Sequence, residues 1–175
     1  IGYQRGMETG DLEFAAHCLF LNLWYKFHAC YELNSLKEEI IKFGDIVKKI
    51  KQETQLNIIK MIEQLVEKLT NESEKPYLFK GSIYDSEKML KIHTEANDRT
   101  AIAGVYLLRM ELSYLFNEYE MGVENAVKFK PYLESIAGSY TFGLSFFYDS
   151  LVHLAVYDNC GWFRKKIILR RIRSN

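Results

Sequence analysis

The stretch LNSLKEEIIKFGDIVKKI, residues 33–50, decides the fold class. Its apolar side chains recur at alternating intervals of four and three residues, which places them on one side of an α-helix: Leu36, Ile40, Phe43, Val47 and Ile50. Charged side chains fill most of the other positions and form a solvated face. Such a helix must bury its apolar stripe against another element, so we expect the flanking segments to be helical too.

The segments on either side of this stretch predict two more helices. Gly10 and Asp11 mark a helix stop followed by an N-cap. Residues 11–32 are then apolar on almost every side, which is typical of a helix that other elements cover. The charged residues in that segment argue against a membrane span. After residue 50 the stripe is repeated at Ile58, Ile62, Leu65 and Leu69.

The second half of the chain begins with an irregular segment. Residues 71–84 contain Pro76 and Gly81 together with five apolar side chains, so we expect a loop packed over the helices. Asp85 is expected to cap a short helix, and a long helix is expected from Glu95 to Phe116.

A tight turn at residues 117–118 leads to two further predicted helices. The first is expected to point these side chains inward: Val123, Ala126, Val127, Phe129, Leu133 and Ile136. Gly138 then stops it, with Ser139 as a possible new cap. The last core helix is expected to bury Phe142, Phe146, Phe147, Leu151, Leu154 and Ala155. No pair of strands is indicated.

Two helices share a spacing that favours a repeat architecture. A large residue, a small residue three positions later and a packing residue four beyond that occur at Leu12, Ala15 and Leu19, and again at Tyr119, Gly122 and Ala126. This spacing is the second-helix signature of tetratricopeptide-type repeats, although the hairpins here span about 40 residues rather than about 34. We predict an all-α fold of antiparallel helical hairpins stacked as a tetratricopeptide-like α-solenoid; an irregular helical bundle is the alternative.

The chain carries no motif for catalysis, for a cofactor or for a metal ion. Glycine-rich phosphate loops and the protein-kinase motifs are absent, and residues 79–82 contain a single glycine that reads as a turn. The His17-Cys18 pair and the His28-x-Cys30 pair lie about 16 Å apart on one helix, too far for one tetrahedral metal. We therefore expect no catalytic residue, no cofactor and no metal site.

Residues 93–99 form the densest polar cluster and allow two interpretations. His93 can be a phospho-accepting histidine or part of an acid–base centre. Alternatively, Asn97 and Asp98 cap or brace the long helix, and Asp98 and Arg99 make local pairs. We favour the structural interpretation, because a phospho-accepting histidine normally sits beside an ATP-binding domain and none is encoded here.

The charge distribution sets the C-terminal segment apart. The 23 basic and 23 acidic side chains balance, which gives no electrostatic case for nucleic acid. Six of the basic residues lie in 159–175, which has no acidic residue, so residues 1–158 carry a net charge of −6. A basic amphipathic tail can bind anionic lipid or nucleic acid. We favour a severed helix or an altered reading frame, and divide the chain into a helical repeat region, 1–158, and a basic tail, 159–175, that is non-native or truncated.

Four stretches carry a resemblance to a known family. They are Gly10-Asp11-Leu12-Glu13-Phe14-Ala15, Glu95-Ala96-Asn97-Asp98-Arg99-Thr100, Tyr119 with Val123-Glu124-Asn125-Ala126, and Phe147-Tyr148-Asp149-Ser150-Leu151. Together they resemble the helical region of the large cyanobacterial-type multi-sensor signalling kinases. In that family a serine/threonine-kinase domain is followed by a predicted AAA ATPase, a tetratricopeptide-like helical region, a GAF sensor and often a histidine kinase.

The resemblance covers residues 5–158 and implies a piece of a cytoplasmic bacterial signalling protein whose catalytic domains lie outside this chain. Its structural signature here comprises Gly10, Asp11, Ala15, Asn97, Asp98, Arg99, Tyr119, Gly122, Ala126, Tyr148 and Asp149. We expect a non-catalytic scaffold or relay segment that contacts protein partners or neighbouring domains. The alternatives are a chain that acts as part of a serine/threonine or histidine kinase, and attachment to a membrane or nucleic acid through the tail.

Overall fold

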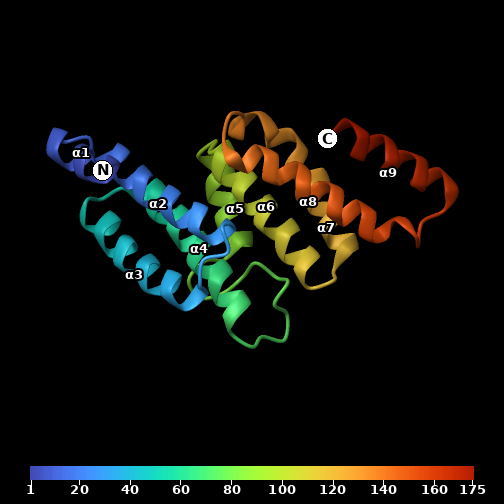
Figure 1. The fold of residues 1–175 in the computed structure, drawn as a ribbon, viewed down its shortest axis with the longest axis horizontal. Helices are drawn as coiled ribbons and strands as arrows, with labels where there is room; N and C mark the ends of the chain where they lie inside the picture. Colours follow the sequence, from blue (N-terminus) through green and yellow to red (C-terminus); the bar gives the residue numbers. More distant parts are fainter. The chain divides into compact units, whose positions relative to one another are not determined.

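The computed structural model describes all 175 residues, and it confirms an all-helical fold without strands (Figure 1). An isolated bridge between Lys80 and Asp85 is its single β-type pairing. The helices are α1 (Gly2–Thr9), α2 (Leu12–His28), α3 (Leu33–Lys49), α4 (Glu53–Thr70), α5 (Ser86–Glu95), α6 (Arg99–Leu115), α7 (Tyr119–Phe129), the 3₁₀ helix η1 (Lys130–Ile136), α8 (Tyr140–Tyr157) and α9 (Trp162–Ser174).

The chain divides into two compact units. The N-terminal unit comprises Ile1–Glu72 and Gly81–Tyr84, and the C-terminal unit comprises Ser73–Lys80 and Asp85–Asn175. No helix in either unit combines the length and the apolar composition needed to cross a bilayer. Each unit has its own buried apolar side chains.

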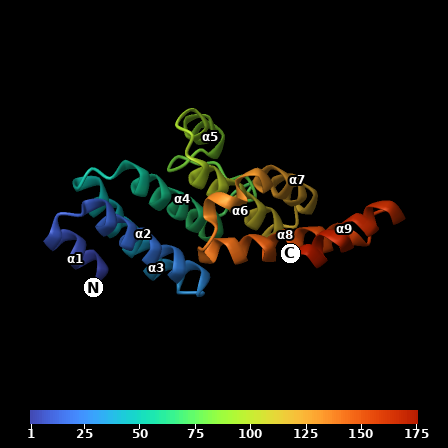
Figure 2. The same cartoon turned by 90° about the horizontal axis from the view of Figure 1, so that it is seen from above.

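The N-terminal unit is built from α1–α4. Helix α1 packs on α2, α3 packs on α4, and α2 contacts both α3 and α4; α2 and α3 run side by side in both views (Figures 1 and 2). The stripe predicted for residues 33–50 is fully buried at Leu36, Ile40 and Val47. In α4 the predicted residues Ile58 and Leu69 are only half-buried. The buried face of α4 is wider and includes two glutamines, because this helix is covered by two neighbours.

Small residues set the distance between α1 and α2. A Cβ atom on Gly6 would lie 2.9 Å from the Cβ of Ala15 and 2.8 Å from its backbone nitrogen. Gly10 ends α1 with φ of 78°, and Asp11 caps α2 by accepting a hydrogen bond from the backbone N–H of Phe14 at 3.0 Å. The predicted stop and cap are therefore confirmed.

The C-terminal unit is arranged around α6. This helix packs against α5, α7, η1 and α8, and α9 returns along α8 (Figure 1). The long helix begins at Arg99 rather than at Glu95, because Asn97 adopts a left-handed conformation with φ of 52° and Asp98 caps the new helix. The predicted turn is confirmed at Asn117, whose φ is 63°, and the predicted stop at Gly138, whose φ is 81°.

The helix predicted after residue 118 is interrupted. Helix α7 ends at Phe129, and the chain continues as η1, which has Pro131 near its start. Proline has no N–H with which to continue an α-helical ladder. Ala126, Phe129 and Ile136 are buried as predicted, whereas Val127 is 57% exposed, so its predicted inward position is wrong. Val127 lies on the side of α7 away from α6 and α8, which its neighbours Gly122 and Ala126 face.

Gly122 controls the packing of α7. A Cβ atom at this position would lie 2.6 Å from Cγ1 and 3.1 Å from Cβ of Val152 on α8, and 3.4 Å from Cβ of Ser113 on α6. Val152 is fully buried and its β-branched side chain is stiff at χ1, so it has little freedom to move away. The close approach of α7 to its two neighbours therefore requires glycine at position 122.

This contact predicts opposite effects for two glycine-to-alanine substitutions within helices. Gly122→Ala is expected to destabilise the protein by about 1–3 kcal/mol, because the added methyl group overpacks a filled contact. Gly143→Ala is expected to stabilise it by about 0.5–1 kcal/mol, because alanine favours the helix and a Cβ there meets nothing within 4 Å. Urea unfolding followed by circular dichroism measures both; equal effects would contradict the assigned α7–α8 packing.

Candidate interaction surface

Helix α8 buries its more polar face and exposes its more apolar face. Its buried positions include three polar side chains and two valines: Ser145, Asp149, Val152, His153 and Val156. These positions lie on one side of a helix with 3.6 residues per turn. This buried side packs within the C-terminal unit, against α6, α7 and α9.

The side of α8 opposite to the buried positions carries a continuous apolar row, which we call the α8 stripe. It follows the same four–three spacing as residues 33–50 and consists of Tyr140, Leu144, Phe147, Leu151 and Leu154. Tyr140, Phe147 and Leu154 are 48%, 56% and 49% exposed, and the two other leucines are half-buried. The single Asp, Glu, Lys or Arg of α8 is Asp149, which is buried, so the exposed surface of the helix carries no formal charge.

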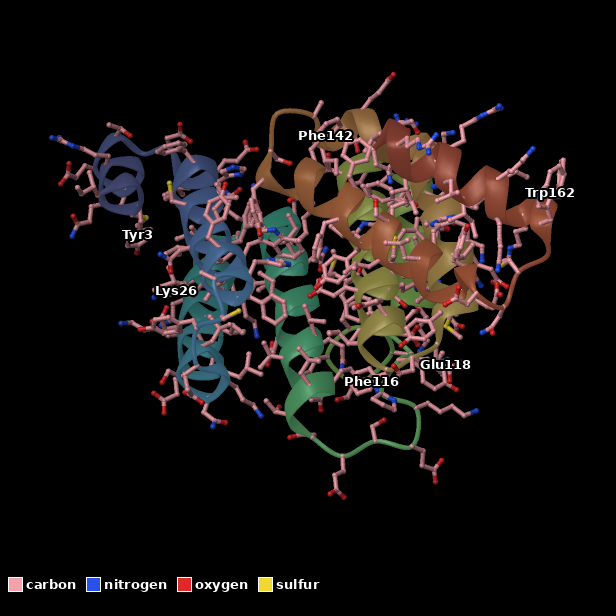
Figure 3. All side chains as sticks on the ribbon, turned by 45° about the vertical axis from the view of Figure 1, so that its right-hand side comes forward. Tyr3, Lys26, Phe116, Glu118, Phe142 and Trp162 are labelled. Carbon is pink, nitrogen blue, oxygen red and sulfur yellow. The ribbon has the colours of Figure 1, made fainter.

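The inward set predicted for this helix is therefore wrong at Phe147 and Leu154. Phe142, Phe146, Leu151 and Ala155 are half-buried; Phe142 lies near the start of the helix (Figure 3). The prediction assumed that the more apolar face points to the core. Here the less apolar face does so, because other helices supply partners for its polar groups.

Asp149 is held by groups at the end of the chain. Nε and Nη2 of Arg171 donate to the two carboxylate oxygens at 2.8 and 2.7 Å, and Nδ2 of Asn175 donates to Oδ2 at 2.7 Å. Burial alone would raise the pKa of the Asp149 carboxyl, but the hydrogen bonds and the positive charge of Arg171 outweigh it, so that this pKa lies below its ordinary value. Asp149 is thus a buried carboxylate with a bidentate partner.

His153 completes the polar cluster one turn further along α8. Its Nδ1 lies 2.7 Å from the Asp149 carbonyl oxygen, so this nitrogen carries a hydrogen and donates it. Burial lowers the pKa of His153 more than the nearby Asp149 groups raise it, and Arg171 and Arg164 lower it further. The imidazole is therefore neutral near pH 7, and the cluster carries one compensated ion pair.

The basic tail is tied to the rest of the C-terminal unit by its charges. Arg164 pairs with Glu120 of α7 through two hydrogen bonds of 3.0 and 2.6 Å. Lys165 lies 5.0 Å from the centre of the Tyr157 ring of α8. Within α9 itself, Lys166 lies 3.9 Å from the centre of the Trp162 ring, at the outer end of the helix (Figure 3). The division of the chain at residue 158 stays a prediction; the structure adds that residues 162–174 form a helix packed on α8.

The cluster of residues 93–99 connects two helices. Asp98 accepts a hydrogen bond from Ala101 N–H at 3.0 Å, as predicted for an N-cap, and lies 3.8 Å from His93. Burial is the main cause that lowers the pKa of His93. The local pair predicted for Arg99 is wrong: Arg99 donates to the carbonyl oxygen of the distant Pro131 at 2.6 Å.

The other signature residues are distributed rather than gathered. Tyr119 donates to Asn117 Oδ1 at 2.5 Å and braces the α6–α7 turn. Tyr148 donates to Glu111 Oε1 of α6 at 3.1 Å. Ala126 and Asp149 line one cavity beside α9, whereas Gly10, Asp11 and Ala15 belong to the N-terminal unit. The set therefore does not form one site; each member serves a cap, a turn or a helix contact.

Comparisons with protein-family models, with curated proteins and with solved structures give no match for this chain. No group of three or more His, Cys, Asp or Glu side chains is arranged to hold a metal ion. The three cysteines are free thiols.

The sequence predicted neither the exposed α8 stripe nor the buried Asp149–Arg171 pair. Arg171 lies 22 residues from Asp149, and no local pattern links them. The spacing of the α8 stripe is visible in the sequence, but the same spacing in residues 33–50 marks a buried face. An aspartate and a histidine four residues apart, in a helix that is otherwise uncharged, are the one local signal that the polar side turns inward.

The ion pair predicts unequal effects for two arginines of the same helix. Arg171→Gln is expected to destabilise the protein by about 3 kcal/mol, because it leaves the buried Asp149 carboxylate without its main partner. Arg173→Gln removes the same charge from an exposed position and is expected to change stability by about 0.5 kcal/mol or less. Chemical unfolding of both variants measures this difference; equal losses would show that the Asp149–Arg171 pair does not form.

The buried histidines predict a pH dependence of stability. Because the pKa of His153 is lowered from 6.5, the unfolded chain binds a proton at a pH where the folded chain does not. His93 acts in the same direction. The free energy of unfolding is therefore expected to fall as the pH decreases from 7 to 5 and to fall less steeply in His153→Gln. A flat profile for the unmodified protein, or an unchanged slope in His153→Gln, would contradict the prediction.

Proposed function

We propose that the chain is a non-catalytic scaffold or relay segment of a multidomain signalling kinase, built from stacked tetratricopeptide-like helical hairpins. In this proposal it acts by contact with protein rather than by chemistry, and the α8 stripe is the contact surface. The observation that carries the proposal is the exposure of Tyr140, Phe147 and Leu154 on a helix face without charge. Apolar rows of this kind are typical of protein interaction sites.

The hairpins supply supporting observations. Helix pairs α1–α2 and α6–α7 each join through a short turn and pack against each other. In the α1–α2 pair, Gly6 lies directly against Ala15. In the α6–α7 pair, Gly122 lies near Ser113 of α6, at 3.4 Å from its Cβ, although its tightest contact is with Val152 of α8. Small residues at the contact between consecutive helices are what the repeat signature requires.

The spacing of the α8 stripe specifies the kind of partner. Side chains that alternate at four and three residues interdigitate with the same pattern on a second helix crossing at about 20°. Because the exposed surface of α8 has no charge, ion pairs cannot set the register, and the contact depends on apolar packing. We therefore propose that the partner element is an amphipathic helix of a neighbouring domain.

Site-specific crosslinking tests this proposal. A photo-crosslinking amino acid at Phe147, in the longest polypeptide that contains this chain, is expected to capture a segment whose apolar residues alternate at four and three positions. Val127, which is 57% exposed on α7, provides a matched apolar control and is expected to capture at least about fivefold less. An added copy of the chain without the photo-crosslinker should compete for the captured partner. A copy that carries Phe147→Lys should no longer compete, although its thermal unfolding midpoint is unchanged.

Two outcomes would contradict the proposal. Equal capture from positions 147 and 127 would show that the α8 stripe has no dedicated partner. ATP turnover by the isolated chain would show that it acts as an enzyme.

A further inference from the structure

A cavity of about 200 Å³ lies in the C-terminal unit, away from the α8 stripe. Its walls come from the loop of residues 77–80, the start of α5, the middle of α6 and one side of α7. None of the signature residues lines it, and the proposed contact through α8 does not use it.

Asn125 places an unpartnered hydrogen-bond acceptor in the wall of this cavity. Its side chain is 4% exposed, and its Nδ2 donates to the Met121 carbonyl oxygen one turn earlier at 2.9 Å. That assignment leaves the amide oxygen Oδ1 without a partner, although the side chain belongs to the cavity lining. Because no protein donor is bonded to this oxygen, a ligand that supplies an N–H can pair with it.

Ser86 places a donor in the same wall. Its side chain is 1% exposed, and its Oγ accepts hydrogen bonds from Nε and Nη2 of Arg109 at 3.0 and 2.7 Å. Two incoming donors occupy the lone pairs of the hydroxyl oxygen, so the hydroxyl hydrogen remains to be donated. The cavity thus offers one acceptor and one donor on well-buried side chains of α7 and α5.

The two lysines at the rim of the cavity each lie near a glutamate. Lys80 pairs with Glu87 at 2.9 Å, and Lys128 lies 4.0 Å from Glu124. Each lysine is therefore compensated by a glutamate. The guanidinium of Arg109, which donates to Ser86, also lines the cavity, so the charged side chains of the lining sum to +1. Leu78 and Met121 add apolar lining.

We propose that this cavity binds an amide group of an extended peptide segment from a protein partner. The amide N–H donates to Oδ1 of Asn125, its carbonyl oxygen accepts from the Ser86 hydroxyl, and a neighbouring apolar side chain lies against Leu78 and Met121. A carboxylate has no N–H for Asn125, and an ammonium group has no acceptor for Ser86. A neutral amide carries both groups at once.

This inference rests on the proposed function only for the source of the peptide, since amide binding is testable by itself. The probe is N-acetyl-leucine N-methylamide, which carries two backbone-type amides and one apolar side chain. It is titrated into the full chain at millimolar concentrations while ¹H–¹⁵N spectra report the Asn125 side-chain amide and the Ser86 backbone amide. Acetate and methylammonium, each with half of the recognised chemistry, serve as matched small-molecule controls. N-methylacetamide and acetamide, run as separate arms, distinguish a backbone amide from a primary side-chain amide.

Saturable shifts at both reporter groups with the capped leucine, and weaker ones with N-methylacetamide, are the expected result. Asn125→Leu retains the size of the side chain without the acceptor and is expected to weaken binding about tenfold, whereas Asn159→Leu, at an exposed position outside the cavity, should not change it. Ser86→Ala, which removes the donor, provides a second variant if Asn125→Leu unfolds.

Three results would overturn the inference: equal shifts with acetate or methylammonium, unchanged binding in folded Asn125→Leu or Ser86→Ala, or no shift with any amide, which would mean that ordered water alone fills the cavity. Stronger binding of acetamide than of N-methylacetamide would assign the site to a primary amide and overturn the backbone assignment. If no amide binds but position 147 gives specific crosslinks, the amide inference fails and the scaffold proposal stands. If amides bind but position 147 gives no specific crosslink, the amide site stands and the peptide does not come from the proposed partner.

Discussion

The contact between Gly122 of α7 and Val152 of α8 is the constraint on which the C-terminal unit depends. There is no room for a Cβ at position 122. The backbone of α7 therefore lies closer to α8 than it could with any larger residue at this position. Because Val152 must face this contact, α8 can adopt only one orientation about its own axis. Asp149 and His153, on the same side of the helix, must then turn inward with it.

The carboxylate of Asp149 can be buried only because Arg171, which is distant in the sequence, neutralises its charge. The bidentate hydrogen bonds from Arg171, together with Asn175 and the neutral His153, satisfy groups that would otherwise make burial costly. The same rotation leaves the apolar row of α8 at the surface. The exposed α8 stripe and the buried Asp149–Arg171 ion pair are therefore two consequences of the same orientation of α8.

Helix α7 links this packing to the amide cavity. Asn125 follows Gly122 by three residues and lies on a neighbouring part of the same helix, so the close approach that positions α8 also positions the Asn125 side chain. The protein thus presents two kinds of recognition chemistry on one unit. One is an uncharged apolar helix face that suits another helix, and the other is a small polar cavity that suits a single amide.

The sequence by itself determined the helices and many of their ends, because those signals act over a few residues. The caps at Asp11 and Asp98, the left-handed turn at Asn117 and the stop at Gly138 all follow from local hydrogen bonds and backbone preferences. Only the tertiary structure decided which face of α8 is buried. That choice depends on an arginine 22 residues away and on a glycine of the preceding helix, and the free energy of such contacts is absent from the periodicity of any single segment.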